Sequence, residues 1–165
     1  MPTPAMADRQ SFVATLRSER EAFARFLGLL ESESAALLRG DVEDIVRLSA
    51  AKTTQVEALT ALSEQRLEQL RAEGFTPDRI GMSEWLIVHG NDDHASLSRL
   101  WEDLLKDAGE ARRLNENNGV MIDARLRFNR AALSTLRGAM HHQVPVYGPD
   151  GSHEFHSQGR PLGLA

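Results

Sequence analysis

Large apolar side chains recur at every seventh position near the start of the chain, and this spacing limits the folds that can form. The repeated positions are Leu16, Phe23, Leu30 and Leu37, and the stripe is widened by Phe12, Phe26, Leu27 and Leu38. A seven-residue repeat places these side chains on one face of a helix, where they can pack against other helices. The pattern predicts one long helix over residues 8–39.

The chain is predicted to reverse direction immediately after this helix. Gly40 can adopt a positive φ and end the helix, while Asp41 can cap the next one, with Asp44 placed as a capping-box acid. A continuous helix through Gly40 is the alternative, although glycine costs about 1 kcal/mol inside a helix. We therefore expect an antiparallel hairpin of two helices, each about 50 Å long at 1.5 Å per residue.

The second helix is predicted to run from Asp41 to Glu73 and to end at Gly74. Its inward positions are Val42, Ile45, Leu48, Val56, Leu59, Leu62 and Leu70, and the stripe is interrupted by Lys52, Gln55, Arg66 and Gln69. Residues 74–91 are then expected to form a connector. Within it, Thr76-Pro77-Asp78 is typical of a helix start with Pro at the first helical position, and Ser83 is expected to cap a short turn. Its large apolar groups should plug the end of the bundle, with a ligand pocket as the alternative; they are Trp85, Leu86 and Val88.

A third helix is predicted from Asp92 or Asp93 to Met140. Its first part carries a strong apolar stripe made of Leu97, Leu100, Trp101, Leu104, Leu105 and Ala108. A helix of this length would span about 70 Å, so about four turns would extend beyond the hairpin. The expected fold is all-α, an elongated antiparallel three-helix bundle with an overlong C-terminal helix and a flexible C-terminal tail.

Composition agrees with helices and excludes several classes of function. Aromatic residues are only 5% of the chain, so leucine and alanine must supply most of the core, as suits helix packing. A net charge of −5 argues against nucleic acid as the main partner. The longest apolar run, residues 85–88, is too short for membrane insertion, and the N-terminus lacks the pattern of a secretory signal. A cytoplasmic location is expected.

Residues 1–140 are expected to form a helical domain and residues 141–165 a flexible tail, because the tail has three Pro, four Gly and few aliphatic residues. Histidines occur in the tail, but without Cys or an evident scaffold they do not predict a metal site. No phosphate-binding loop, metalloprotease motif or nucleophile motif is present, so we expect neither a cofactor nor catalysis.

The far part of the third helix is the candidate binding site. Its apolar positions are Met121, Ile122, Phe128, Ala132, Leu133 and Leu136, and its polar positions on or beside the stripe are Asn115, Asn118, Arg125 and Asn129. Such a stripe beyond the hairpin would be costly in water unless a partner helix covered it. The alternative is that the helix bends back or dimerises, which would make the stripe ordinary core.

The same segment resembles the C-terminal third of the flagellar export chaperone FlgN family. The matching positions are Leu114, Asn115, Asn118, Gly119, Ile122, Arg125, Leu126, Asn129 and Leu133, followed by Tyr147, Gly148, Asp150 and Gly151. A looser match covers Gly40-Asp41 and the helices on either side. The resemblance implies a chaperone that holds hook-associated proteins of the FlgK and FlgL type, prevents their premature assembly and delivers them to the export gate.

The resemblance also implies roles for individual residues. The client-binding positions predicted from the matching residues and the apolar stripe together are Leu114, Asn115, Asn118, Met121, Ile122, Arg125, Phe128, Asn129, Leu133 and Leu136. Tyr147 is the position to which binding of the cytoplasmic domain of the export gate can be transferred. The alternative function is a generic helical adaptor or dimeric coiled-coil regulator without a role in secretion.

Overall fold

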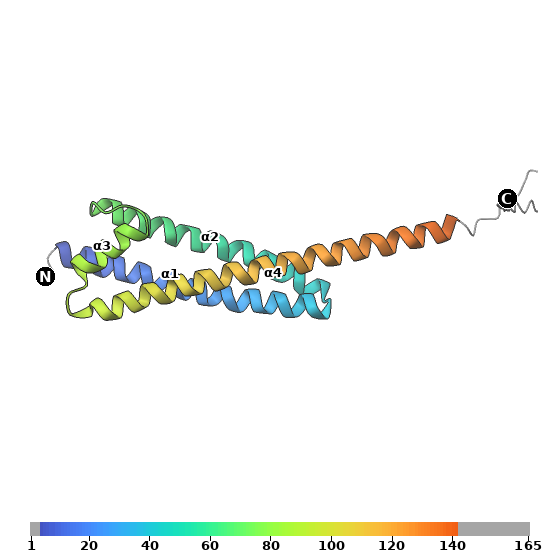
Figure 1. Ribbon diagram of the computed structural model, residues 1–165, viewed down its shortest axis with the longest axis horizontal. Coiled ribbons are helices and arrows are strands. Elements are labelled where there is room, and N and C mark those ends of the chain that lie inside the picture. The colour runs from blue at the N-terminus through green and yellow to red at the C-terminus, as the bar shows by residue number, and fades with distance from the viewer. Residues whose placement is uncertain (1–3, 142–165) are drawn as a thin grey trace, which may run out of the picture. The chain divides into compact units, whose positions relative to one another are not determined.

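A computed structural model of the protein describes residues 4–141, with side chains described for residues 8–139 (Figure 1). The regular structure in this range is helical and contains no strand. The helices are α1 (Pro4–Arg39), α2 (Val42–Ala72), α3 (Arg79–His89) and α4 (His94–His141), with a short 3₁₀ helix at Asn91–Asp93. The predicted all-α class is confirmed, and α3 is a full helix where a connector with a helix start and a short turn was expected.

The chain divides into two compact units, Met1–Asp123 and Ala124–Ala165, and each is described by itself. Unit 1 contains α1, α2, α3 and the first part of α4. Of unit 2, the structure describes the last part of α4. The predicted flexible tail, residues 141–165, lies outside the described residues except for the backbone of His141.

The predicted break between the first two helices is confirmed. Gly40 has a φ of 76°, and the backbone amides of Gly40 and Asp41 both donate to the Ala36 carbonyl, at 2.9 and 3.1 Å. The Asp41 side chain then accepts from the amide of Asp44 at 3.1 Å, which starts α2. This geometry excludes the alternative of one continuous helix.

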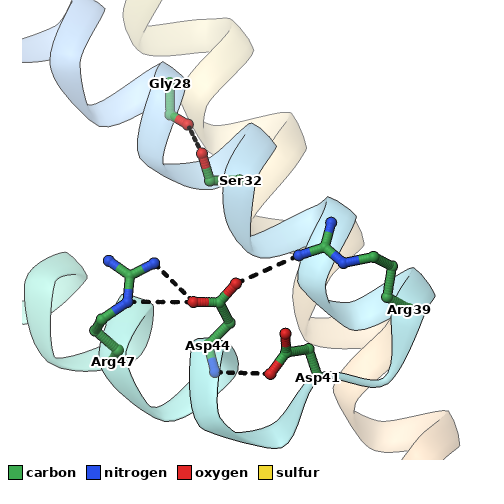
Figure 2. Close-up of polar contacts among 6 residues, drawn as sticks. All are labelled: Gly28, Ser32, Arg39, Asp41, Asp44 and Arg47. Atoms are coloured by element: carbon green, nitrogen blue, oxygen red, sulfur yellow. Dashed lines mark hydrogen bonds and ion pairs between the residues drawn. The ribbon is translucent and has the colours of Figure 1, made fainter.

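Asp44 has a role at this turn beyond the one that its sequence position predicts. Its carboxylate lies between Arg39 of α1 and Arg47 of α2, at 3.3 and 2.8 Å (Figure 2). The hydrogen bond from Arg47 lowers the pKa of the Asp44 carboxyl. Asp44 therefore links the two helix ends through their arginines.

Unit 1 has a core to which all four helices contribute. Its larger cluster contains Phe12, Val13, Leu16, Leu70, Met82, Trp85, Leu86, Leu97, Trp101 and Leu104, which come from α1, α2, α3 and α4. A second cluster, formed by α1, α2 and α4, contains Ala22, Phe26, Leu30, Leu59 and Ala111. The heptad positions of α1 and the first stripe of α4 therefore pack into the core, as predicted. Leu38, Val42 and Val56 were also predicted to face inward, but they are 77%, 69% and 46% exposed.

The connector forms a full helix rather than a short turn. Asp78 caps it, because its Oδ1 accepts from the amides of Ile80 and Gly81 at 2.8 and 2.9 Å. These bonds, with the Gly81 amide contributing most, lower the pKa of the Asp78 carboxyl. Ser83, predicted as the cap, lies inside α3 and donates to the Arg79 carbonyl. The capping prediction was wrong because Asp78 supplies the acceptor five residues earlier.

The predicted apolar plug is confirmed for two of its three residues. Trp85 and Leu86 are buried, whereas Val88 is 58% exposed on the outer face of α3. The Trp85 ring lies 4.1 Å from that of Phe12 between centroids, and its Nε1 donates to Glu73 at 3.0 Å. The backbone at Thr76, just before α3, packs closely against this helix, since a Cβ on Gly81 would lie 2.0 Å from the Thr76 carbonyl oxygen.

Candidate protein-interaction surface

The described part of unit 2 presents large apolar side chains to solvent. On α4, Leu126, Phe128, Leu133 and Leu136 are 46%, 72%, 55% and 59% exposed. We call these four residues together with Asn129, which is also exposed, the Leu126–Leu136 surface. Burying a leucine or phenylalanine side chain contributes about 1.5–3 kcal/mol. A group of exposed apolar residues of this kind is typical of a surface that binds another protein.

The same stretch of α4 is strongly basic. Residues 124–139 contain four arginines and no aspartate or glutamate; the arginines are Arg125, Arg127, Arg130 and Arg137. Arg127, Arg130 and Arg137 are exposed, and Arg125 is half-buried. The Leu126–Leu136 surface therefore combines apolar contact area with positive charge, which suits a partner that is both apolar and acidic.

The other predicted client-binding residues belong to unit 1 and differ in exposure. Asn115 is exposed, and Leu114, Met121 and Ile122 are half-buried. Leu114 packs against the second core cluster. Leu114 thus contributes to the core of unit 1, while Phe128, Asn129, Leu133 and Leu136 are the predicted residues with the most open side chains.

Asn118 requires a correction. Its place beside the apolar stripe predicted a binding surface, but its side chain is fully buried in unit 1. Its Nδ2 donates to the Leu30 carbonyl at 2.9 Å and to Glu33 Oε2 at 2.8 Å. The two N–H groups of this amide supply hydrogen bonds to a buried carboxylate and to a helix carbonyl, both on α1. Asn118 therefore joins α4 to α1. We therefore remove it from the proposed contact surface.

Two buried acids in α1 escaped the sequence analysis. Glu19 is paired with Arg66 at 2.7 Å, and Glu33 is paired with Lys52 at 2.7 Å. Each glutamate follows a core leucine by three residues, Leu16 and Leu30 respectively, and so occupies an apolar position of the heptad. An acid at an apolar heptad position could have indicated a buried ion pair, because the α2 stripe is interrupted by two basic residues, Lys52 and Arg66.

The ion pairs on the unit 1 part of α4 are of a different kind, because they lie in solvent. Arg112 contacts Glu116 at 2.9 Å, and Arg113 contacts Glu110. The Glu116 carboxylate raises the pKa of the Arg112 guanidinium, and the hydrogen bond from Arg113 lowers the pKa of Glu110. These pairs balance charge within unit 1, whereas residues 124–139 contain arginine but no aspartate or glutamate.

Within residues 4–141, no helix has the length and apolarity needed to cross a membrane. No group of three or more His, Cys, Asp or Glu side chains among the described residues could hold a metal ion. The histidines of the tail and Tyr147, the predicted contact with the export gate, lie outside the described residues. The chemistry available on the Leu126–Leu136 surface is that of protein binding through apolar contact and arginine charge.

Comparison with known proteins decides the family. A sequence model of the FlgN protein family matches residues 6–154, which include all of the described part of α4 and Tyr147. The chain belongs to the FlgN family. FlgN proteins are flagellar export chaperones, so this chain has a role in flagellum biogenesis through type III protein export.

A solved FlgN structure has the same fold. It is the 1.48 Å crystal structure of a protein described as a flagella synthesis protein FlgN from Pseudomonas aeruginosa. The two chains are 22% identical and superimpose with a TM-score of 0.62, over 74% of this chain and 90% of that one. No match was found among curated protein sequences. FlgN architecture is therefore retained at low sequence identity.

Proposed function

We propose that this FlgN protein binds hook-associated proteins of the FlgK and FlgL type in the cytoplasm through the Leu126–Leu136 surface, prevents their premature assembly and delivers them to the export gate. The observation that supports this proposal most directly is the exposure of four large apolar side chains on one stretch of α4. In a chain of a chaperone family, such a surface is best explained by a client that covers it.

The physical basis of the chaperone action is competition for apolar surface. A client segment that forms an amphipathic helix can lie along α4 and bury its apolar face against Leu126, Leu133 and Leu136. While it is bound, that face cannot pair with another client molecule, so assembly is delayed. This mechanism requires no cofactor, nucleic acid or membrane insertion, and it uses residues 1–140 as the chaperone domain.

Replacing Leu133 and Leu136 together with aspartate should weaken client binding by at least about a hundredfold, because two buried apolar contacts are lost and two charges enter the contact. Both side chains are more than half exposed, so the melting temperature should change little. Ile122 is a poorer choice for this test because it is half-buried in unit 1. Binding is measured by titration with purified hook-associated protein.

The matched control is Ala131→Asp with Ser134→Asp, which adds the same charge at exposed positions between the apolar residues of α4. This control should lose much less affinity. If the leucine variant binds hook-associated protein as tightly as the wild type, the proposed surface is wrong. If neither the wild type nor the variant binds hook-associated protein, but both retain another partner from the cell, the generic adaptor function is favoured.

We further propose that Tyr147 contacts the cytoplasmic domain of the export gate. Tyr147→Ala should leave client affinity within about 0.5 kcal/mol, as expected for a residue outside the client contact. The same variant should bind the export-gate domain more weakly and secrete less hook-associated protein. Titration of wild type and variant against both partners measures this, and equal binding to the gate would exclude the role.

A further inference from the structure

The apolar residues of the Leu126–Leu136 surface are spaced as in a coiled coil. Leu126, Asn129, Leu133 and Leu136 follow one another at intervals of three, four and three residues, and all are exposed. This alternation forms the narrow row through which two helices pack in a left-handed coiled coil. We call these four residues the Leu126 row. Phe128 lies to one side of it.

Arginines flank the Leu126 row. The row residues occupy heptad positions a (Leu126, Leu133) and d (Asn129, Leu136). Arg130 and Arg137 follow the d positions, Arg125 precedes an a position, and Arg127 falls at position b, outside the flanks. In a coiled coil these are the positions whose charges meet those of the partner helix. With no acid in residues 124–139, the partner meets only positive charge along the row.

This charge pattern disfavours a second copy of the chain as the partner. If two copies paired in parallel through the row, Arg125 of one would face Arg130 of the other. If they paired antiparallel, Arg130 of one copy would face Arg137 of the other. Like charges at these positions are destabilising in either orientation. Self-pairing therefore does not explain how the row is covered.

We infer that the Leu126 row binds an acidic helix with apolar residues at the same three-four spacing, glutamate or aspartate at its flanking positions, and a polar side chain opposite Asn129. This inference rests on the proposed function and specifies the class of client segment that the surface selects. Once the partner helix covers it, the Asn129 amide favours one register, because it is satisfied only by a polar side chain. The arginines provide selection between acidic and basic helices.

An anionic membrane is the other surface that could attract arginines and leucines on one helix. The narrow spacing of the row favours a helix, because a helix that lies on a membrane presents a broader apolar face. Phe128 is the only described large apolar side chain of unit 2 outside the row. Vesicle binding is therefore the outcome that separates the two partners.

The test uses the full chain and two synthetic three-heptad peptides. Both peptides carry leucine along one row with a single asparagine, and they differ only in having glutamate or lysine at the flanking positions. The glutamate peptide should bind at least about tenfold more tightly than the lysine peptide, and added salt should reduce this difference. Arg130→Glu with Arg137→Glu should reverse the order of the two affinities.

The control variant is Arg99→Glu with Arg127→Glu, which changes the net charge equally at exposed positions of α4 that do not flank the row. It should keep the wild-type order. Equal affinity for the two peptides, or a control that reverses the order like the row variant, would overturn the inference. So would binding to phosphatidylserine vesicles without binding to either peptide, or a dimer in sedimentation that Leu133→Asp dissolves.

The outcomes also separate this inference from the proposed function. If the glutamate peptide binds but hook-associated protein does not, the charge selection stands and the proposed client is wrong. If hook-associated protein binds equally to the wild type and to the Arg130→Glu, Arg137→Glu variant, the client stands and the charge selection is overturned.

Discussion

Replacing Arg66 with alanine should reduce the free energy of unfolding by about 3–5 kcal/mol, because it leaves a buried carboxylate without its partner. Glu19 is 1% exposed, and Arg66 Nε lies 2.7 Å from its Oε2. A second arginine nitrogen lies 3.3 Å from the other carboxylate oxygen. Equilibrium unfolding in urea, followed by circular dichroism, measures the loss.

The surroundings of this pair explain why water cannot easily replace the arginine. Arg66 also donates to the Ser63 hydroxyl at 3.2 Å, and its guanidinium carbon lies 5.1 Å from the centre of the Trp101 ring. The arginine therefore connects α2 to α1 by charge and to α4 by contact with an aromatic face. Removing it would leave both a charged acid and a gap in the core.

A double variant distinguishes the cost of a stranded charge from the value of the pair. Glu19→Leu with Arg66→Met should be near wild-type stability or above it, since apolar residues often replace buried ion pairs without loss. Arg112→Ala serves as the control, because its pair with Glu116 is largely exposed and should matter much less. An Arg66→Ala variant as stable as the wild type would show that Glu19 is not held in a buried pair.

The register of the α1–α2 hairpin could have been predicted from these charged residues. Glu19 and Glu33 are two heptads apart in α1, and their partners Arg66 and Lys52 are two heptads apart in α2, in the opposite direction. An antiparallel pair of helices that turns at Gly40 must show this relation. The sequence analysis placed Gly40 correctly but treated Lys52 and Arg66 only as interruptions of an apolar stripe.

Residues 74–91 show what helical spacing alone could not predict. Four of their large apolar residues stand in one run at residues 85–88, so periodicity did not separate a helix from a turn, and Ser83 was predicted as the cap that Asp78 provides. The position of Asn118 depends on α1, because only a buried Glu33 makes an amide favourable in the core of unit 1. Contacts between distant segments determine both features, and a local pattern does not contain them.

The exposure of the apolar residues in the last part of α4 was predicted more successfully, because the prediction used only the helical spacing of the local sequence. It did not require knowledge of a contact between distant segments. Phe128, Leu133 and Leu136 were identified in this way, and all three are exposed. Their role in client binding remains a prediction for the variants described above to test.

Replacing Trp85 with alanine should also reduce the free energy of unfolding by about 3–5 kcal/mol, because it removes the largest fully buried side chain of unit 1. The indole contacts Phe12 of α1, stacks on His89 of α3 at 5.0 Å between ring centroids, and donates to Glu73 at the end of α2. One ring thus joins three helices, and its loss leaves a cavity that the connector cannot fill.

Trp85→Phe separates the packing of the ring from its hydrogen bond. It should cost less than the alanine variant, since an aromatic ring remains against Phe12 and Glu73 keeps its contact with His89 at 3.4 Å. Ile87→Ala is the matched control, because Ile87 is exposed on the same helix and its truncation should stay within about 0.5 kcal/mol. Urea unfolding of the three variants should therefore give the largest loss for Trp85→Ala, a smaller one for Trp85→Phe and the smallest for Ile87→Ala. If Trp85→Ala has the same free energy of unfolding as the Ile87→Ala control, α3 is not anchored through this ring.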